Sequence, residues 1–392
     1  MAKHIDRDEL IRTCRELVKI PSISGDEGRA VAFLEEKMKE MDFDEVHIDG
    51  YGSLLGKVEG RGGGRTVLLD GHIDTVGVGD PEAWTHDPFG AEIADGRIYG
   101  RGTSDMKAAL SAMLHAAAFC VEERPEGDVY VSATVHEEMF EGVALQRILD
   151  SIDVDYVIIG EASELNLKTG QRGRAELKLT SHGKSCHSAN PQHGVNAVYM
   201  AEPLIRALRK MKLPEDENLG RGILELTDII SKPYPGASVV PSECRITYDR
   251  RLVEGETAES VVSDMMSVIR GCMEKDAGIS AELEITEGSA DCYTGEGILA
   301  SRLFPAWYYG PEEAFVQAAL RALKGAGIPA KLDVYSFCTN GSTSAGILGI
   351  PTIGFGPSSE NLAHVSDEYV EIEQLVTSAD GYEALVRVLN AG

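Results

Sequence analysis

The chain has 392 residues, more than one hydrophobic core usually organises, because cores stop growing at roughly 250–300 residues. Two domains are therefore expected. Apolar residues make up 43% of the sequence and charged residues 26%, which is typical of a globular protein rather than a disordered or fibrous one. The net charge of −27 would repel a phosphate backbone, so nucleic acid is excluded as an expected partner.

The N-terminus carries charges of both signs at helical spacing and lacks the apolar stretch of a signal peptide. No segment approaches the roughly 20 consecutive apolar residues of a membrane span. The seven cysteines are scattered without CxxC spacing, which indicates neither a disulfide framework nor a cysteine-type zinc site. We therefore expect a cytoplasmic protein that has no membrane partner.

The first 174 residues alternate helix-like and strand-like stretches, a pattern that predicts a mixed α/β sheet covered by helices. The glycine-rich run 60–65 is predicted to be a hairpin turn between its two neighbouring strands. In chain order, the expected elements are helices near 6–19 and 26–41, strands within 46–60 and 66–76, a helix over 107–120, and strands within 128–139 and 154–163.

From residue 175 the pattern becomes strand, helix, two strands, helix and strand, which is a βαββαβ unit. Such a unit can bury its own core, so we expect residues 175–290 to form an inserted, ferredoxin-like domain. After it the α/β pattern resumes, with a helix near 311–325 and strands within 334–337 and 349–356. Residues 1–174 and 291–392 together are therefore expected to form the α/β domain that carries the chemistry.

His72 and Asp74 end an apolar strand, and their i, i+2 spacing places both side chains on one face. The Asp74 carboxylate could then hold the second imidazole nitrogen of a metal-bound histidine, although an isolated His-x-Asp pair is more often a surface hydrogen bond. Asp105 closes a glycine-bearing loop just before the 107–120 helix. It could bridge two cations there, and the alternative is an ordinary helix N-cap.

Adjacent Glu137 and Glu138 would point to opposite sides of an extended backbone. One could ligate a metal while the other faces water, and the alternative is a solvated acidic turn. Glu161 follows four apolar residues and a glycine, where a charge needs compensation for its desolvation. With His364 from the far end of the chain, these side chains make the mixed oxygen and nitrogen donor set that suits zinc or its neighbours.

This ordered series of motifs resembles the M20 metallopeptidase family, which includes acetylornithine deacetylase, succinyl-diaminopimelate desuccinylase and glutamate carboxypeptidases. The resemblance spans nearly the whole chain and rests on DGHIDTV (70–76), GRIYGRGTSDMK (96–107), GEAS (160–163), HGKSCHSANP (182–191) and AHVSDE (363–368). The chain departs from well-known members at Ser238 and Ala345, where asparagine and an acidic residue are frequent. Together with QRGR (171–174) and SFCTNG (336–341), these departures look most like the YgeY-type hydrolases, whose name associates them with selenium metabolism.

The resemblance implies a pair of divalent metal ions per subunit, zinc or alternatively cobalt or manganese. The ligands would be His72 and Glu161 for one ion, Glu138 and His364 for the other, and Asp105 between them. Asp74 would support His72 from behind, and Glu137 would be the general base. The peptide bond after the bridging aspartate is commonly cis in this family, so a cis Asp105–Met106 bond is also expected.

In the inserted domain the resemblance selects His187, which would reach a neighbouring subunit's active site and stabilise the tetrahedral oxyanion. It thereby implies a homodimer formed through this domain. Arg251 matches the arginine that grips the substrate carboxylate, a task suited to a planar two-pronged donor. Arg250 is the alternative, and either arginine could simply form a surface salt bridge. Ser342 and Thr343 lie in a small-residue loop that resembles the family's substrate loop.

The function implied is hydrolysis of an amide or peptide bond in a small amino-acid-derived substrate with a free carboxylate. Metal-activated water would attack, with Glu137 as its base. A non-catalytic, metal-dependent binding protein is the alternative, but Glu137 beside Glu138 is not needed to hold metal. Among hydrolases, a deacylase, a dipeptidase or carboxypeptidase, and a carbamoyl or ureido amide hydrolase remain open.

Overall fold

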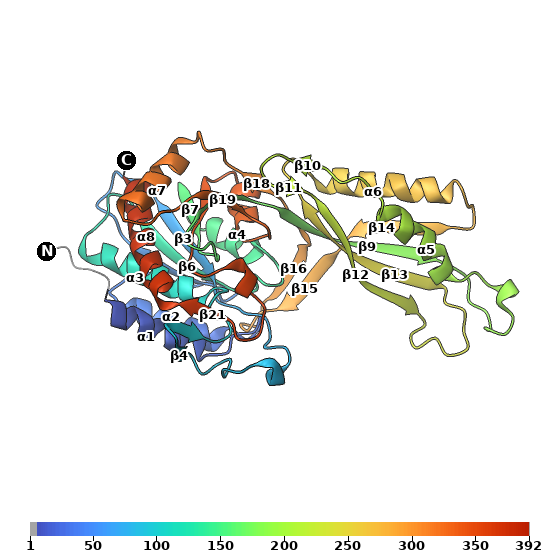
Figure 1. Cartoon of the computed structure of the whole chain (residues 1–392), viewed down its shortest axis with the longest axis horizontal. Helices are drawn as coiled ribbons and strands as arrows, with labels where there is room; N and C mark the ends of the chain where they lie inside the picture. Colours follow the sequence, from blue (N-terminus) through green and yellow to red (C-terminus); the bar gives the residue numbers. More distant parts are fainter. Residues whose placement is uncertain (1–5, 392) are drawn as a thin grey trace. The chain divides into compact units, whose positions relative to one another are not determined.

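The computed structural model describes residues 6–391, and the chain folds into two compact units (Figure 1). Unit 1 is assembled from three stretches of chain, Met1–Gln171, Ser289–Leu299 and Trp307–Gly392. Unit 2 is formed by Arg172–Gly288 and Ala300–Ala306. The first and last parts of the sequence therefore build unit 1 together.

The centre of unit 1 is a nine-stranded mixed sheet. Its strands are, in spatial order, β1 (Glu45–Ile48), β2 (Leu54–Val58), β6 (Val129–Thr134), β3 (Val67–His72), β7 (Tyr156–Ile159), β20 (Thr352–Gly354), β8 (Leu167–Gln171) and β18 (Trp307–Tyr308), with β19 (Leu332–Tyr335) also paired to β8. The inner strands β6, β3, β7 and β20 run parallel. Their carboxyl ends therefore meet at one edge of the sheet, where open α/β sheets place their functional sites.

Helices cover both faces of this sheet because successive strand residues point to opposite sides. On β3, Val67 and Leu69 enter a larger core, and Leu68 between them enters a smaller one. The larger core is covered by α1 (Arg7–Val18), α2 (Gly28–Glu40), α3 (Lys107–Glu122), α7 (Ala314–Gly325) and α8 (Ile372–Asn390), and the smaller one by α4 (Val143–Leu149).

Helix α3 is buried on almost every side. Its many alanines allow α1 and α8 to pack closely against it, and α3 and α8 lie side by side (Figure 1). The helices predicted near 6–19, 26–41 and 107–120 are thus confirmed. Among the described residues, no helix combines the length and the apolar character that crossing a bilayer requires.

A small three-stranded sheet joins distant parts of unit 1. It consists of β4 (Glu92–Ala94), β5 (Arg97–Tyr99) and β21 (Tyr369–Glu371). Strands β5 and β21 pair antiparallel, with Tyr99 opposite Tyr369. The loop that follows β5 and the segment that precedes β21 are therefore brought to the same place.

The predicted hairpin at 60–65 is wrong. Strand β6 lies between β2 and β3, antiparallel to the former and parallel to the latter, so the two strands are not neighbours. The glycines serve a close backbone crossing instead, because a side-chain carbon at Gly60 or Gly64 would collide with the backbone of Gly127. Periodicity along the chain reveals that strands exist, but it carries no information about a third strand inserted between them.

Unit 2 contains the predicted order of strand, helix, two strands, helix and strand. Its antiparallel sheet has the order β12 (Ile223–Lys232), β13 (Glu243–Leu252), β9 (Gly173–His182) and β14 (Ser280–Ile285), and β17 (Leu303–Phe304) also pairs with β9. Alternate residues of β13 are buried and pack against α5 (Ala197–Leu208) and α6 (Ala258–Met273). A small hairpin of β10 (Glu215–Asp216) and β11 (Gly220–Arg221) completes the strands of unit 2. A second hairpin, β15 (Glu287–Asp291) with β16 (Gly297–Ser301), has most of its residues in unit 1.

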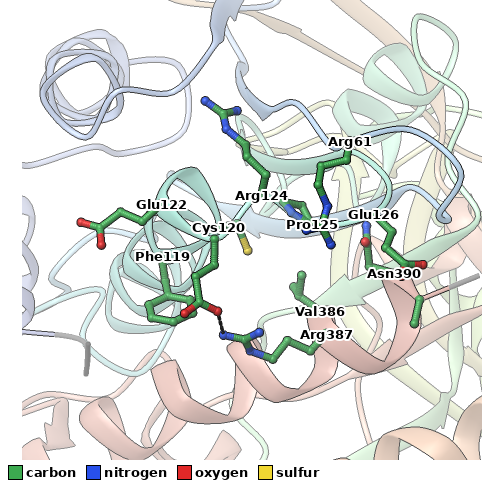
Figure 2. Close-up of a pocket in the computed structure, with 12 residues that line it drawn as sticks. Arg61, Phe119, Cys120, Glu122, Arg124, Pro125, Glu126, Val386, Arg387 and Asn390 are labelled. Carbon is green, nitrogen blue, oxygen red and sulfur yellow. Dashed lines mark hydrogen bonds and ion pairs between the residues drawn. The ribbon is translucent and has the colours of Figure 1, made fainter. Parts of the chain in front are cut away.

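The end of α8 is fixed by one side chain at the edge of a cavity of about 610 Å³ between α3 and α8 (Figure 2). Asn390 is buried, and its Nδ2 donates to the carbonyl oxygens of Arg65 at 2.7 Å and Gly127 at 2.8 Å. Its Oδ1 accepts the Gly127 N–H at 2.9 Å. Nearby, Arg387 pairs with Glu123 across the two helices. Asn390 thus joins the last turn of α8 to the loop crossing before β3.

Replacing Asn390 with Ala should lower the free energy of unfolding of unit 1 by about 3 kcal/mol, because buried backbone groups lose their partners. Asn390→Asp keeps the acceptor but turns a carboxylate toward two carbonyls, so it should destabilise at least as much. Arg387→Gln, which removes half-exposed ion pairs with Glu123 and Glu383 and a contact with the Phe119 ring, is the control and should cost about 1 kcal/mol. Urea unfolding followed by tryptophan fluorescence measures this, since Trp84 and Trp307 both belong to unit 1. If Asn390→Ala has the stability of the wild type, Asn390 does not stabilise the end of α8 as described.

Candidate metal centre

Three of the predicted ligands lie where neighbouring parallel strands end. His72 is the last residue of β3, Glu138 follows β6, and Glu161 follows β7. Strands β6, β3 and β7 are adjacent in the sheet, so these side chains converge at one edge. The small sheet brings the remaining two ligands together, because Asp105 follows β5, His364 precedes β21, and these two strands pair.

The five predicted ligands form two groups that share Asp105: His72 with Asp105 and Glu161, and Glu138 with Asp105 and His364. In the first group, His72 Nε2 lies 2.8 Å from Asp105 Oδ1 and 3.5 Å from Glu161 Oε1. In the second, His364 Nε2 lies 3.1 Å from Asp105 Oδ2 and 2.9 Å from Glu138 Oε2. Asp105 therefore presents one carboxylate oxygen to each group.

The charges of this cluster favour cation binding. Burial and the nearby charge of Asp105 raise the pKa of Glu138 to about 7, and the same two causes raise the pKa of Glu161. Hydrogen bonds to Asp105 and Glu138 raise the pKa of His364 to about 10. Each group offers one imidazole nitrogen and two carboxylates, a donor set that fits a divalent ion such as zinc. The chain thus concentrates acidic groups at one place, and a bound cation would offset their mutual repulsion.

Comparison with known proteins agrees with this geometry. A model of peptidase family M20/M25/M40 matches residues 68–388 of the chain. The chain belongs to this family. The resemblance predicted from the motifs is therefore confirmed, as is the mixed α/β fold class.

Two curated relatives match almost the whole M20 chain. The uncharacterized protein YgeY of Escherichia coli (strain K12) is 33% identical, over 96% of this chain and 93% of its own length. A succinyl-diaminopimelate desuccinylase of Cereibacter sphaeroides (strain ATCC 17025 / ATH 2.4.3) is 30% identical, over 92% and 93% of the two chains. With such relatives the M20 chain is a metal-dependent hydrolase, which sets aside the alternative of a non-catalytic binding protein.

Solved structures share the fold of this M20 hydrolase. Aminopeptidase PepT from Bacillus cereus ATCC 10987 has a TM-score of 0.76 at 21% identity, covering 98% of this chain and 99% of its own. The YXEP protein of Bacillus subtilis, described as a dinuclear metal binding peptidase of the M20 family, has a TM-score of 0.73 at 14% identity, covering 98% and 99%.

The alternative role of Asp105, as the N-cap of the helix that follows it, is wrong. The N-cap of α3 is Met106, and no side chain donates to or accepts from the cap position. The Asp105–Met106 peptide bond is cis, as the family resemblance implied. The Asp105 carboxylate is therefore left to the two groups of ligands.

The Asp74 carboxylate lies within ion-pair range of His72 Nδ1 but makes no hydrogen bond to it. His72 Nδ1 donates to the backbone oxygen of Asp74 at 2.9 Å, and the carboxylate stays 3.7 Å away. That carboxylate instead accepts the N–H groups of Glu137 at 3.0 Å and Glu138 at 3.2 Å, and the Ser24 hydroxyl at 2.7 Å. The i, i+2 rule fails here because β3 ends at His72. Asp74 thus orders the turn that carries both glutamates, and its backbone oxygen fixes the imidazole with Nε2 toward Asp105 and Glu161.

The two glutamates separate, but not by the predicted extended backbone. They lie in a turn after β6 in which His136 has a φ of +55°. Glu138 contacts His364, whereas Glu137 Oε1 is buried and has no hydrogen-bond partner among the described residues. Burial raises the pKa of Glu137 well above its usual value, and the charge of Glu161 adds to the effect. A basic oxygen without a protein partner is thereby held next to the ligands.

The small-residue loop lies behind the ligands and is tied to the sheet by groups that sequence reasoning missed. Asn340 Nδ2 donates to Asp70 Oδ2 of β3 at 2.8 Å and to the Thr134 hydroxyl of β6 at 2.9 Å. Ser342 Oγ accepts from Gln171, the last residue of β8, at 3.0 Å, and Thr343 is also buried. Asp70 could have been noticed in the sequence, because it is a charged residue within an otherwise apolar strand.

In unit 2 the structure separates the two candidate arginines. Arg250 is buried and paired with Glu256, so it is engaged inside the unit and cannot reach a substrate. The partly exposed Arg251 donates from Nε to Asp249 at 2.7 Å. The exposed His187 accepts the Ala189 N–H on Nδ1, so its neutral imidazole carries the proton on Nε2.

The sharing of Asp105 predicts different losses for two ligand variants. Asp105→Ala removes an oxygen from both groups, whereas Glu161→Ala removes one from the first group alone. We expect Asp105→Ala to weaken both bound ions by at least about tenfold, roughly 1.4 kcal/mol each, and Glu161→Ala to weaken only one. Zinc titration in competition with a chelator measures both affinities. Two ions held by Asp105→Ala at wild-type affinity would refute the shared carboxylate.

Proposed function

We propose that the chain hydrolyses an amide bond in a small amino-acid-derived substrate with a free carboxylate, using two divalent metal ions per subunit. The observation that carries this proposal is the division of the Asp105 carboxylate, one oxygen to each group of ligands. The desuccinylase among the relatives and the dinuclear peptidase among the structures with the same fold support it. A peptide bond, as in dipeptidases and carboxypeptidases, is the neighbouring possibility within the same chemistry.

The ions would be zinc, or alternatively cobalt or manganese, and would be held by His72, Asp105, Glu138, Glu161 and His364. When bound, such a pair lowers the pKa of water toward about 7 and polarises a carbonyl oxygen. Hydrogen bonds to Asp74 and Glu368 hold His72 and the Asp105 backbone in place, and Glu161 follows the end of strand β7.

Glu137 would be the general base. Its buried Oε1 has no partner among the described residues, and its raised pKa suits a group that accepts a proton from attacking water. The same carboxyl would then return the proton to the leaving nitrogen. Asp74 would position Glu137 through the backbone N–H that it accepts.

Substrate contacts are proposed for four further residues. Arg251 would bind the substrate carboxylate with its planar guanidinium, and the Nε2–H of His187, from a neighbouring subunit, would stabilise the oxyanion. Ser342 and Thr343 would shape the substrate side of the small-residue loop. Release of amine from a panel of N-acyl amino acids and dipeptides, with and without chelator, tests this. Chelator-insensitive release, or no release from any member of the panel, would contradict the proposal.

Glu137→Gln should retain both metal ions and lose turnover by at least about 100-fold, because an amide cannot accept the proton. Glu141→Gln changes another buried carboxyl of the same turn and is the matched control, for which we expect a much smaller loss. Metal content and kcat are measured on the same preparations. Full activity of Glu137→Gln would show that Glu137 is not the general base.

We also propose that two copies pair through unit 2. Strand β12 forms an edge of its sheet, and no other strand among residues 6–391 pairs with its outer side. Ile223, Ile229 and Ile230 on this strand are exposed, and open apolar edges invite pairing with another chain. Ile229→Asp should therefore yield monomers in sedimentation experiments, whereas Leu299→Asp, on an exposed residue of unit 1, should leave the dimer intact. A wild-type protein that sediments as a monomer would contradict this pairing.

A further inference from the structure

Glu368 is a fully buried carboxylate that the proposed mechanism does not use. Its Oε2 accepts from Arg101 Nη1 at 2.6 Å and from the Gly102 N–H at 3.1 Å. Its Oε1 accepts the Ser104 N–H at 2.6 Å and the Asp105 N–H at 3.1 Å. Four donors from one short loop therefore converge on a single side chain.

This convergence fixes the position of Asp105. Backbone N–H groups that all point inward from a loop repel one another unless an anion lies at their centre. The backbone oxygen of Glu368 grips the same loop, because it accepts the Gly100 N–H at 2.9 Å. The loop that carries Asp105 thus takes its shape from Glu368, and the side chain of Asp105 follows its backbone.

Glu368 also belongs to the segment that carries His364, a few residues earlier in the chain. The neighbouring Asp367 accepts from the backbone and hydroxyl of Thr85 at 2.8 Å and 2.6 Å, and from the His86 N–H at 3.0 Å. Two adjacent carboxylates therefore hold one segment to two different loops. Only the loop held by Glu368 contains a ligand.

We infer that Glu368 is a positioning residue that sets the relation between Asp105 and His364, and thereby the affinity of the second group of ligands. This inference rests on the proposed two-metal function. In the second group both Asp105 and His364 are tied through Glu368, and only Glu138 is placed independently. In the first group His72 and Glu161 stand at strand ends, so Glu368 reaches that group through Asp105 alone.

Glu368→Gln tests the inference with almost no change in size. The amide nitrogen of Gln would face N–H donors where an oxygen now accepts them, so the loop must shift. We expect the affinity of the second zinc ion to fall at least about tenfold and that of the first ion to fall less. Zinc titration in competition with a chelator gives both affinities without reference to turnover.

Asp367→Asn makes the same change of charge one residue away and is the matched control, for which both affinities should stay close to wild type. Glu368→Asp keeps the charge but has a shorter side chain, so we expect a smaller loss of affinity for the second zinc ion. This variant keeps the test available if Glu368→Gln does not fold. The inference is overturned if Glu368→Gln binds both ions normally, or if Asp367→Asn loses the second ion equally. A wild-type chain that binds fewer than two ions would overturn the proposed two-metal function. If the wild type binds two ions and Glu368→Gln binds them equally well, only the role of Glu368 is overturned.

Discussion

One carboxylate, Asp105, is shared by two groups of candidate metal ligands, and the rest of the site depends on that sharing. Its two oxygens face His72 on one side and His364 on the other. Buried carboxylates at such distances repel one another, and the raised pKa values of Glu138 and Glu161 report that repulsion together with their burial. The stability of such a fold should depend on cation concentration, because a cation that binds only the folded state raises the free energy of unfolding.

Further carboxylates hold the candidate ligands in place through hydrogen bonds. Asp74 accepts the backbone of the turn that carries Glu137 and Glu138, and Glu368 accepts the backbone of the loop that carries Asp105. Asp70 receives Asn340 and so ties the small-residue loop to β3. In each case an anion organises N–H donors that would otherwise be unpaired inside the protein, which costs more than an ordinary hydrogen bond gains. Rigid placement of the ligands follows from these contacts.

The sequence predicted the helices and the strands, and it indicated a set of candidate ligands, for specific reasons. The Ala-rich helix α3 and the period-two strand β13 have patterns that only one type of element fits. Glu161 at the end of an apolar strand and the ordered family motifs pointed to the ligand set. Strand order could not be predicted, since nothing along the chain shows β6 lying between β2 and β3. The contacts of Asp74 and Glu368 were also missed, because turn geometry decides which donors a carboxylate meets.

The most direct test of the shared carboxylate is anomalous diffraction from crystals of the zinc-loaded protein. Two zinc peaks should appear, one on each side of Asp105, with His72 and Glu161 at one and Glu138 and His364 at the other. A single peak, or two peaks that do not share Asp105, would contradict the account.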